Sequence, residues 1–252
     1  MKNTQIIITI LIASLSFATN ANNWSFEVEP YLMGTSIAGD ASIGRISGAP
    51  IDVDFNTILD NLDMAAMLHF EAHHKSGWGL AIDYGFMDLS QKKSNSRDGF
   101  VKVGIRQGVL ETLGMYRVKY NKNITIDYFT GVRWWDNDLE LILDPAITSG
   151  SQNIKVKEDW LDIVAGMRVN TRINRHWNFI ARADLGGFGM SADFTSTIEA
   201  GATYRISKLM TLDMKYKASW VDYDNEDNIG DVGHYQYDTV THGPILGLNL
   251  SF

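Results

Sequence analysis

The chain has 252 residues, of which 45% are hydrophobic, 21% are charged and none is cysteine. The lack of cysteine excludes disulfides, thiolate metal sites and cysteine nucleophiles. A mean hydropathy of -0.13 argues against a bundle of membrane helices, because each helix would need about 20 largely apolar residues. The formal charge of -8 argues against a nucleic-acid partner, since a phosphate backbone attracts basic surfaces.

The first residues have the pattern of a secretory signal peptide. Lys2 precedes an uncharged apolar run from Ile6 to Phe17, and small residues follow up to Ala21. This order is typical of a signal peptide with its cleavage site. We expect export through the Sec pathway and cleavage after Ala21, with cleavage after Ala18 as the alternative.

Beyond this segment, apolar and polar residues alternate with period two, which predicts β-strands. The apolar face of the clearest segments is unbroken over about ten residues, the length that a tilted strand needs to cross a bilayer. Ten segments show the pattern, in chain order residues 24–32, 68–73, 78–86, 110–120, 124–134, 161–169, 177–185, 194–206, 210–220 and 245–252.

The connections between these segments alternate in length. Short periplasmic turns and longer outer loops are typical of an outer-membrane barrel. We therefore predict an all-β fold, an antiparallel transmembrane barrel of ten strands. A further hairpin within residues 38–55 would give twelve strands, and eight is the remaining alternative. Residues 55–62 have apolar positions at helical spacing and predict a short helix on the rim. The predicted organisation is a signal peptide (1–21) and one barrel domain (22–252), with short turns near 74–77, 121–123, 174–175 and 207–209 and long loops near 38–62, 91–103, 138–158 and 225–237.

Aromatic residues near the strand ends separate a membrane barrel from a soluble one. Such rings form girdles where one side of the ring is dry and the other wet. The residues in question are Trp24, Trp78, Tyr120, Trp134, Trp177, Tyr204, Trp220 and Phe252.

Several stretches resemble an uncharacterised group of small proteobacterial outer-membrane barrels, OmpA/OmpW-like in style. They are PYLMG (30–34), ILDNLD (58–63), GVRWW (131–135), DLGGFGMSADF (184–194) and HGPILGLNLSF (242–252). The resemblance implies the fold and an outer-membrane location, and it brings no substrate or reaction. The last stretch resembles the terminal signal that such barrels present to the barrel-assembly machinery, and its apolar face consists of Leu246, Leu248, Leu250 and Phe252.

The polar faces of the predicted strands carry acidic and basic residues in nearly equal numbers. Charges taken out of water cost several kcal/mol each unless they are paired. A matched set therefore predicts a cross-linked lumen that is closed or narrow. The predicted network consists of Glu71, Asp83, Glu111, Asp127, Arg133, Asp162, Arg168, Arg182, Asp184, Glu199, Arg205, Asp213 and Lys215.

These patterns favour a structural role in the envelope over two other functions. The first alternative is a narrow channel for small polar solutes or ions. The second is a lipid or peptide hydrolase at the rim, although the chain has no G-x-S-x-G motif and we expect no enzyme. Its candidate groups would be His234 with Asp231 or Asp238, His242, and Ser191 with Asp193.

We expect neither a metal nor another cofactor. His69, Glu71 and His73 share one strand face, but alternate residues lie roughly 6.6 Å apart, and pairing with lumen arginines is the simpler interpretation. The loop 222–231 resembles a calcium loop, yet it lacks the glycine and the final acid of an EF-hand. The expected partners are outer-membrane lipids, lipopolysaccharide and the barrel-assembly machinery, and we expect a monomer.

Overall fold

The structure, a computed structural model, describes residues 23–43, 46–94, 100–144, 152–225 and 233–252. The predicted signal peptide lies outside these ranges. None of the helices within them is long and apolar enough to cross a membrane. The elements described are β1 (Trp24–Met33), β2 (Ser36–Ile43), β3 (Ile46–Val53), α2 (Phe55–Asp60), β4 (Leu62–His74), β5 (Trp78–Ser94), β6 (Phe100–Lys119), β7 (Ile124–Asp144), β8 (Gln152–Arg172), β9 (Trp177–Gly187), β10 (Phe194–Arg205), β11 (Met210–Asp224) and β12 (Tyr235–Ser251).

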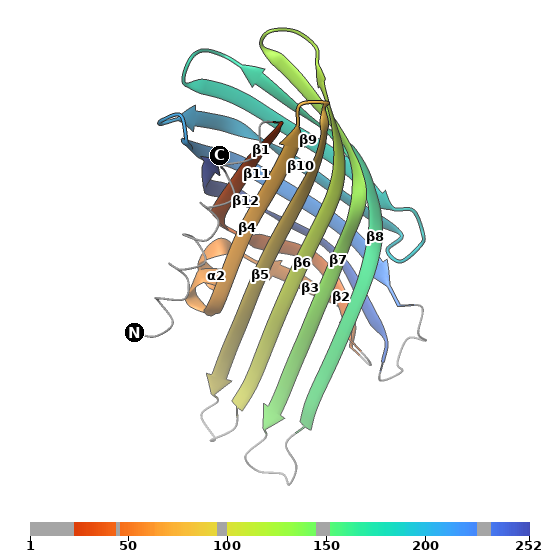
Figure 1. Cartoon of the computed structure of the whole chain (residues 1–252). Helices are drawn as coiled ribbons and strands as arrows, with labels where there is room; N and C mark the ends of the chain where they lie inside the picture. Colours follow the sequence, from red (N-terminus) through yellow and green to blue (C-terminus); the bar gives the residue numbers. More distant parts are fainter. Residues whose placement is uncertain (1–22, 44–45, 95–99, 145–151, 226–232) are drawn as a thin grey trace.

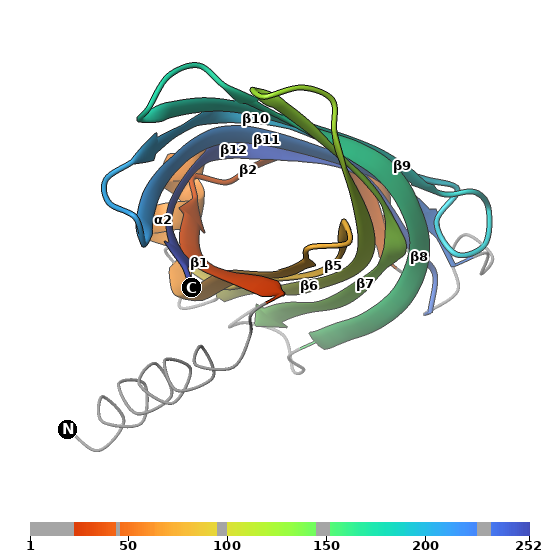
Figure 2. The same cartoon turned by 45° about the horizontal axis from the view of Figure 1, so that its top comes forward.

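In the described ranges, ten strands close into an antiparallel ring (Figures 1 and 2). The ring runs from β1 through β4 and on in chain order to β12, which pairs with β1 again. The predicted ten-stranded barrel is therefore confirmed. The hairpin considered within residues 38–55 is also present as β2 and β3, but it extends the sheet from β12 and does not enter the ring.

The strand register turns the alternating sequence into an apolar outer face and a polar inner face. Leu161 and Ile163 on β8 are exposed on the outside, whereas Asp162 between them is fully buried. The same holds on β12, where Leu246 is exposed and its neighbour Ile245 is buried. Successive side chains of a strand point to opposite faces, so each strand contributes to both surfaces.

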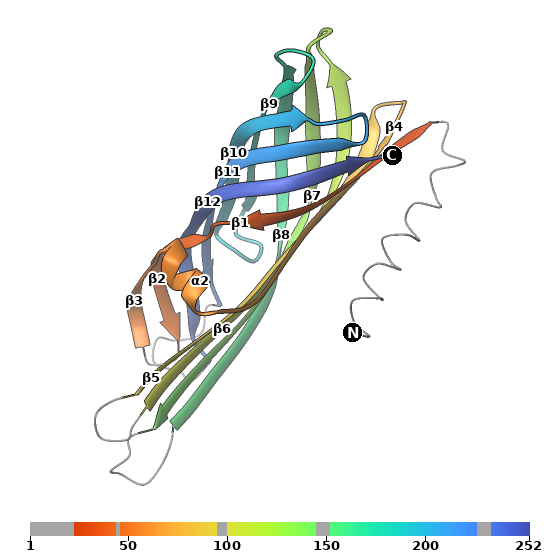
Figure 3. The same ribbon diagram turned by 90° about the vertical axis from the view of Figure 1, so that its left-hand side faces the viewer.

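The strands β5 to β8 are longer than predicted (Figure 3). They include residues 91–94, 100–103, 138–144 and 152–158, which the sequence analysis assigned to loops, and β12 likewise begins inside the predicted loop 225–237. Where side chains are described, the outward positions in the extensions of β7 and β8 are polar; Asp138, for example, forms an ion pair of 3.2 Å with Lys155. The apolar outer face ends there although the strands continue, and a loss of alternation of this kind is typical of a loop.

The wall of the barrel splits beside α2. β1 and β2 pair one after the other with the same edge of β12. Between them, Gly34 N donates a hydrogen bond of 2.8 Å to Pro244 O. On their other edge, β1 pairs with β4 up to Pro30, and β2 pairs with β3 only from Ile37 onward. The intervening residues 31–36 pair with no described strand on that edge, and we call this segment the fork.

The short helix α2 connects β3 to β4 beside the fork (Figure 3). Asp54 caps it by accepting a hydrogen bond from Thr57 N at 2.7 Å. Ile58 is buried in an apolar cluster with Ile37 and Met87, whereas Leu59 is exposed. The short helix predicted at residues 55–62 is thus confirmed over Phe55–Asp60.

Candidate functional site

The barrel interior, or lumen, has three levels. The short-turn end is the end with the turns after β4, β6, β8 and β10, and it holds a polar cavity of about 320 Å³. A smaller cavity of about 90 Å³ follows at mid-lumen. The opposite end, called the loop end, is filled by apolar and aromatic side chains.

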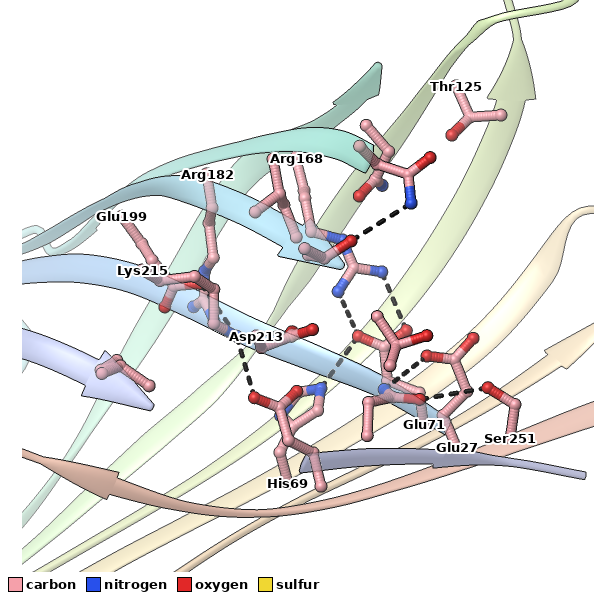
Figure 4. A pocket seen from close by; sticks show the side chains of 18 of the residues that line it. Glu27, His69, Glu71, Thr125, Arg168, Arg182, Glu199, Asp213, Lys215 and Ser251 are labelled. Carbon is pink, nitrogen blue, oxygen red and sulfur yellow. Dashed lines mark hydrogen bonds and ion pairs between the residues drawn. The ribbon is translucent and has the colours of Figure 1, made fainter. Parts of the chain in front are cut away.

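The first charge cluster lies around Glu71 and Arg168, which line the polar cavity (Figure 4). Arg168 donates to Glu71 through both terminal nitrogens and to Asp127 through Nη2 at 2.8 Å. The ring nitrogens of His69 and His73 lie 2.9 and 2.8 Å from the two Glu71 oxygens. Both carboxylate oxygens of Glu71 are therefore occupied by protein groups.

Two further residues extend this cluster on either side. Asp83 lies 3.0 Å from Nδ1 of His69 and accepts a hydrogen bond of 2.9 Å from the hydroxyl of Tyr31. Arg117 donates to Asp127 at 2.6 and 2.9 Å. In the described part of the chain, no three or more histidine and acidic residues are arranged to hold a metal ion.

The second cluster crosses the lumen at the level of Arg133. This guanidinium donates to Glu111 at 2.7 Å and to Asp184 at 2.9 Å. Arg182 donates to the same two carboxylates at 2.6 and 2.8 Å. Two cations thus share two anions, which is how buried charges are compensated away from water.

A third cluster surrounds Lys215 on β11. Its ammonium lies 3.2 Å from Glu29, 3.4 Å from Glu199 and 3.4 Å from Asp213. The three clusters together bring eleven of the thirteen predicted network residues into ion pairs within the described chain.

The other two network residues, Asp162 and Arg205, stand apart. Asp162 was expected to face a cation, but it accepts hydrogen bonds from Trp160 Nε1 at 3.1 Å and Ala192 N at 3.0 Å. Arg205 lines the polar cavity, is exposed, and has no ion pair among the described residues. Asp162 lies opposite Arg133 in the strand register, but the guanidinium of Arg133 is held by Glu111 and Asp184. Arg205 ends β10 at the short-turn end.

Five aromatic residues that the sequence pattern did not indicate pack together at the loop end of the lumen. Trp135 and Trp160 stack with ring centroids 5.5 Å apart, and Trp160 stacks on Tyr223 at 4.0 Å. Two hydroxyls have amide partners, since Gln107 donates to Tyr237 at 3.1 Å and Asn137 donates to Tyr235 at 3.0 Å. We call these residues the aromatic plug: Trp135, Trp160, Tyr223, Tyr235 and Tyr237.

The candidate catalytic groups are not brought together among the described residues. His234 is buried, whereas Asp238 is exposed, and Asp231 lies outside the described ranges. His242 lies 2.7 Å from the hydroxyl of Tyr216. Ser191 donates to Leu161 O at 2.9 Å, and Asp193 is exposed. Most of the calcium-like loop 222–231 lies outside the described ranges.

The four residues of the predicted terminal signal lie on the last strand or directly after it. Phe252 follows β12, and its backbone exchanges hydrogen bonds of 2.9 and 3.2 Å with Phe26 on β1. Leu250 pairs with Val28 across the same seam. The terminal segment therefore closes the ring.

Solved structures share this fold at very low sequence identity. The outer-membrane protease OmpT of Escherichia coli aligns with a TM-score of 0.52 and 6% identity over 92% of this chain and 98% of that chain. The translocator domain of the autotransporter NalP of Neisseria meningitidis gives 0.48 and 11% over 99% and 96%. Ail, the attachment invasion locus protein of Yersinia pestis, gives 0.40 and 9% over 91% and 99%.

No protein-family model and no curated protein matches the chain. Membership of the uncharacterised group of small barrels therefore stays a prediction. At such low identity the likeness to solved structures concerns the fold alone. The chain has the closed antiparallel β-barrel fold of outer-membrane proteins, with ion pairs buried inside it.

Proposed function

We propose that the protein is an integral outer-membrane barrel with a closed lumen and a structural role in the cell envelope. The observation that carries the proposal is the contact across the ring in the aromatic plug, where Asn137 on β7 donates to Tyr235 on β12 at 3.0 Å. The packed rings of the plug occupy the loop end of the lumen. A solute channel would require the aromatic plug to move.

The charge clusters support the same function. Arg133 and Arg182 each bind Glu111 and Asp184, so these four side chains tie β6, β7 and β9 together. Breaking a buried pair leaves an uncompensated charge, at a cost of about 3–5 kcal/mol. The interior therefore stabilises one closed state.

The proposal includes the surroundings of the protein. The exposed apolar outer face, with residues such as Leu161 and Leu246, suits the acyl chains of outer-membrane lipids and lipopolysaccharide. Export through the Sec pathway and insertion by the barrel-assembly machinery would bring the chain there. We propose a monomer because closure of the ring leaves no free edge at the short-turn end.

Planar-bilayer recording tests the closed lumen directly. We expect no reproducible single-channel steps from the refolded protein. Steps that change when Arg133, Arg168 or Arg182 is replaced would support the narrow channel instead. In cells, deletion of the gene should increase sensitivity to detergent and to large antibiotics, and the intact gene should restore resistance.

We propose no enzymatic activity. The rim-hydrolase alternative predicts that refolded protein hydrolyses a lipid or peptide substrate. Loss of that activity in His234→Ala or His242→Ala, with unchanged gel mobility of the folded form, would establish the alternative and contradict our proposal.

A further inference from the structure

An apolar pocket of about 790 Å³ lies beside α2. Its outer part is formed by Phe55 and Leu59 of the helix and by Leu32, Tyr216 and Leu246, whose side chains are exposed on the outer face of the barrel. In a membrane this face contacts acyl chains. The pocket is therefore open to the bilayer.

The pocket continues toward the lumen at the fork. Four of its lining residues, Met33, Thr35, Met67 and Met87, also line the mid-lumen cavity. These side chains are therefore shared by the two spaces. Residues 31–36 pair with no described strand on this edge, so no backbone hydrogen bonds seal the wall here. Methionine side chains are flexible and adapt their shape to an apolar guest.

One charged residue of the mid-lumen cavity has no direct contact to an opposite charge among the described residues. Asp83 is held by Tyr31 and His69, and Arg133 is held by two carboxylates. For Lys217, in contrast, the described residues provide neither an ion pair nor a hydrogen bond, although Lys217 lines both this cavity and the polar cavity. Asp83, Glu111 and Glu199 act on its ammonium only from a longer distance. A carboxylate bound inside the cavity would be a direct acceptor for this ammonium.

We propose that the α2 pocket and the mid-lumen cavity form one binding site for a free fatty acid that enters from the bilayer. The chain lies in the α2 pocket and passes between the three methionines, and the carboxylate binds the ammonium of Lys217. The mid-lumen cavity of about 90 Å³ accepts the head group and first carbons of one chain, which favours a fatty acid over a two-chain lipid. Such a site is compatible with a lumen that conducts nothing.

Photo-crosslinking of the refolded full chain in lipid vesicles tests the site. The probe is palmitic acid with a diazirine near its carboxyl end, and the matched neutral probe is the corresponding fatty alcohol. We expect peptide mapping to find the acid attached to Met33, Met67 or Met87. Lys217→Met should reduce this labelling at least about tenfold, the loss of one charge-assisted hydrogen bond, whereas Lys217→Arg should retain it.

Two controls keep the result interpretable. Lys157→Met removes a lysine whose side chain is 59% exposed, and it should leave the labelling unchanged. Ala65→Phe narrows the α2 pocket without touching Lys217, so it tests the entry route if Lys217→Met fails to show the gel mobility of the folded form.

Three outcomes would overturn the proposal. One is labelling confined to outward residues such as Tyr216 and Leu246. Another is equal labelling of the three methionines by the acid and the alcohol. The third is displacement of the acid by lysophosphatidylcholine at lower concentration than by unlabelled palmitic acid. None of these results would affect the closed lumen, which bilayer recording tests independently.

Discussion

Trp160 on β8 stacks on Tyr223 on β11 with ring centroids 4.0 Å apart and ring planes 8° apart. In the sheet order two strands, β9 and β10, separate them. These two strands are short, with β9 ending at Gly187 and β10 beginning at Phe194, so β8 and β11 meet directly above them. The stack therefore links β8 and β11 where the short hairpin of β9 and β10 no longer separates them.

Removing both rings should open the lumen. Trp160→Ala alone should lower the free energy of unfolding by about 3–5 kcal/mol, because it leaves a cavity in a packed cluster. The double variant with Tyr223→Ala should show single-channel steps in a planar bilayer, whereas the wild type should show none. Trp177→Ala, which removes an exposed ring from the outer face, serves as the control and should not conduct. A silent double variant that is folded would contradict the role of the plug.

Arg133→Met should be among the most destabilising single changes in the lumen. Among the described residues it leaves Glu111 and Asp184 with Arg182 as their one ion-pair partner, and we expect a loss of about 3–5 kcal/mol in urea-induced unfolding from vesicles. Adding Glu111→Leu should recover part of the loss, since it removes one uncompensated charge. Lys155→Ala removes a lysine whose side chain is 58% exposed and pairs with Asp138. This change should cost about 0–1 kcal/mol.

Phe252→Ala should separate assembly in the cell from folding in vitro. The backbone hydrogen bonds between Phe252 and Phe26 do not need the ring, so the purified variant should refold into detergent as the wild type does. In cells, the amount of heat-modifiable protein in the outer-membrane fraction should fall. Equal amounts of folded variant and wild type in that fraction would exclude a signal role for this side chain.

Asp54→Ala should loosen α2 without unfolding the barrel. The carboxylate accepts a hydrogen bond from Thr57 N, and alanine leaves that first-turn group without its capping partner. Hydrogen exchange at Thr57 should become faster, while exchange in β7 stays the same. Asp54→Asn, whose side-chain oxygen also accepts, should restore the slow exchange. An unchanged exchange rate in Asp54→Ala would show that packing of Ile58 alone fixes the helix.

The strands and their two faces could be predicted because the alternation of residues such as Leu161, Asp162 and Ile163 follows directly from the pleat. The aromatic plug could not be found in the same way. Trp135 and Trp160 lie at inward positions, but each has one apolar and one acidic outward neighbour, Trp134 and Asp136 or Leu161 and Asp159. The contrast between the two faces therefore disappears. Continuing the inward series of Arg133 to residues 135 and 137 is the signal that could have located it.

The partners of the charges depend on geometry that a sequence does not contain. Arg168 and Glu71 are 97 residues apart and lie on strands that are not neighbours. Their contact results from the curvature of the whole ring. The balance of charge could therefore be predicted. The hydrogen bond from the Trp160 indole to Asp162 could not, nor could the lack of an ion pair at Lys217 among the described residues. The fork could not be predicted from the sequence either, because it is a difference in strand pairing and not in composition.

The length of β8 determines how far the barrel extends beyond the membrane. Its 21 residues span about 70 Å, or about 50 Å at a tilt of about 45°, against a hydrocarbon core of about 30 Å. Together with β5, β6 and β7 it carries the barrel beyond the lipid as paired strands. A one-residue insertion there would turn every following side chain to the opposite face. Changes of length in this region are therefore tolerated less than changes of length in ordinary loops.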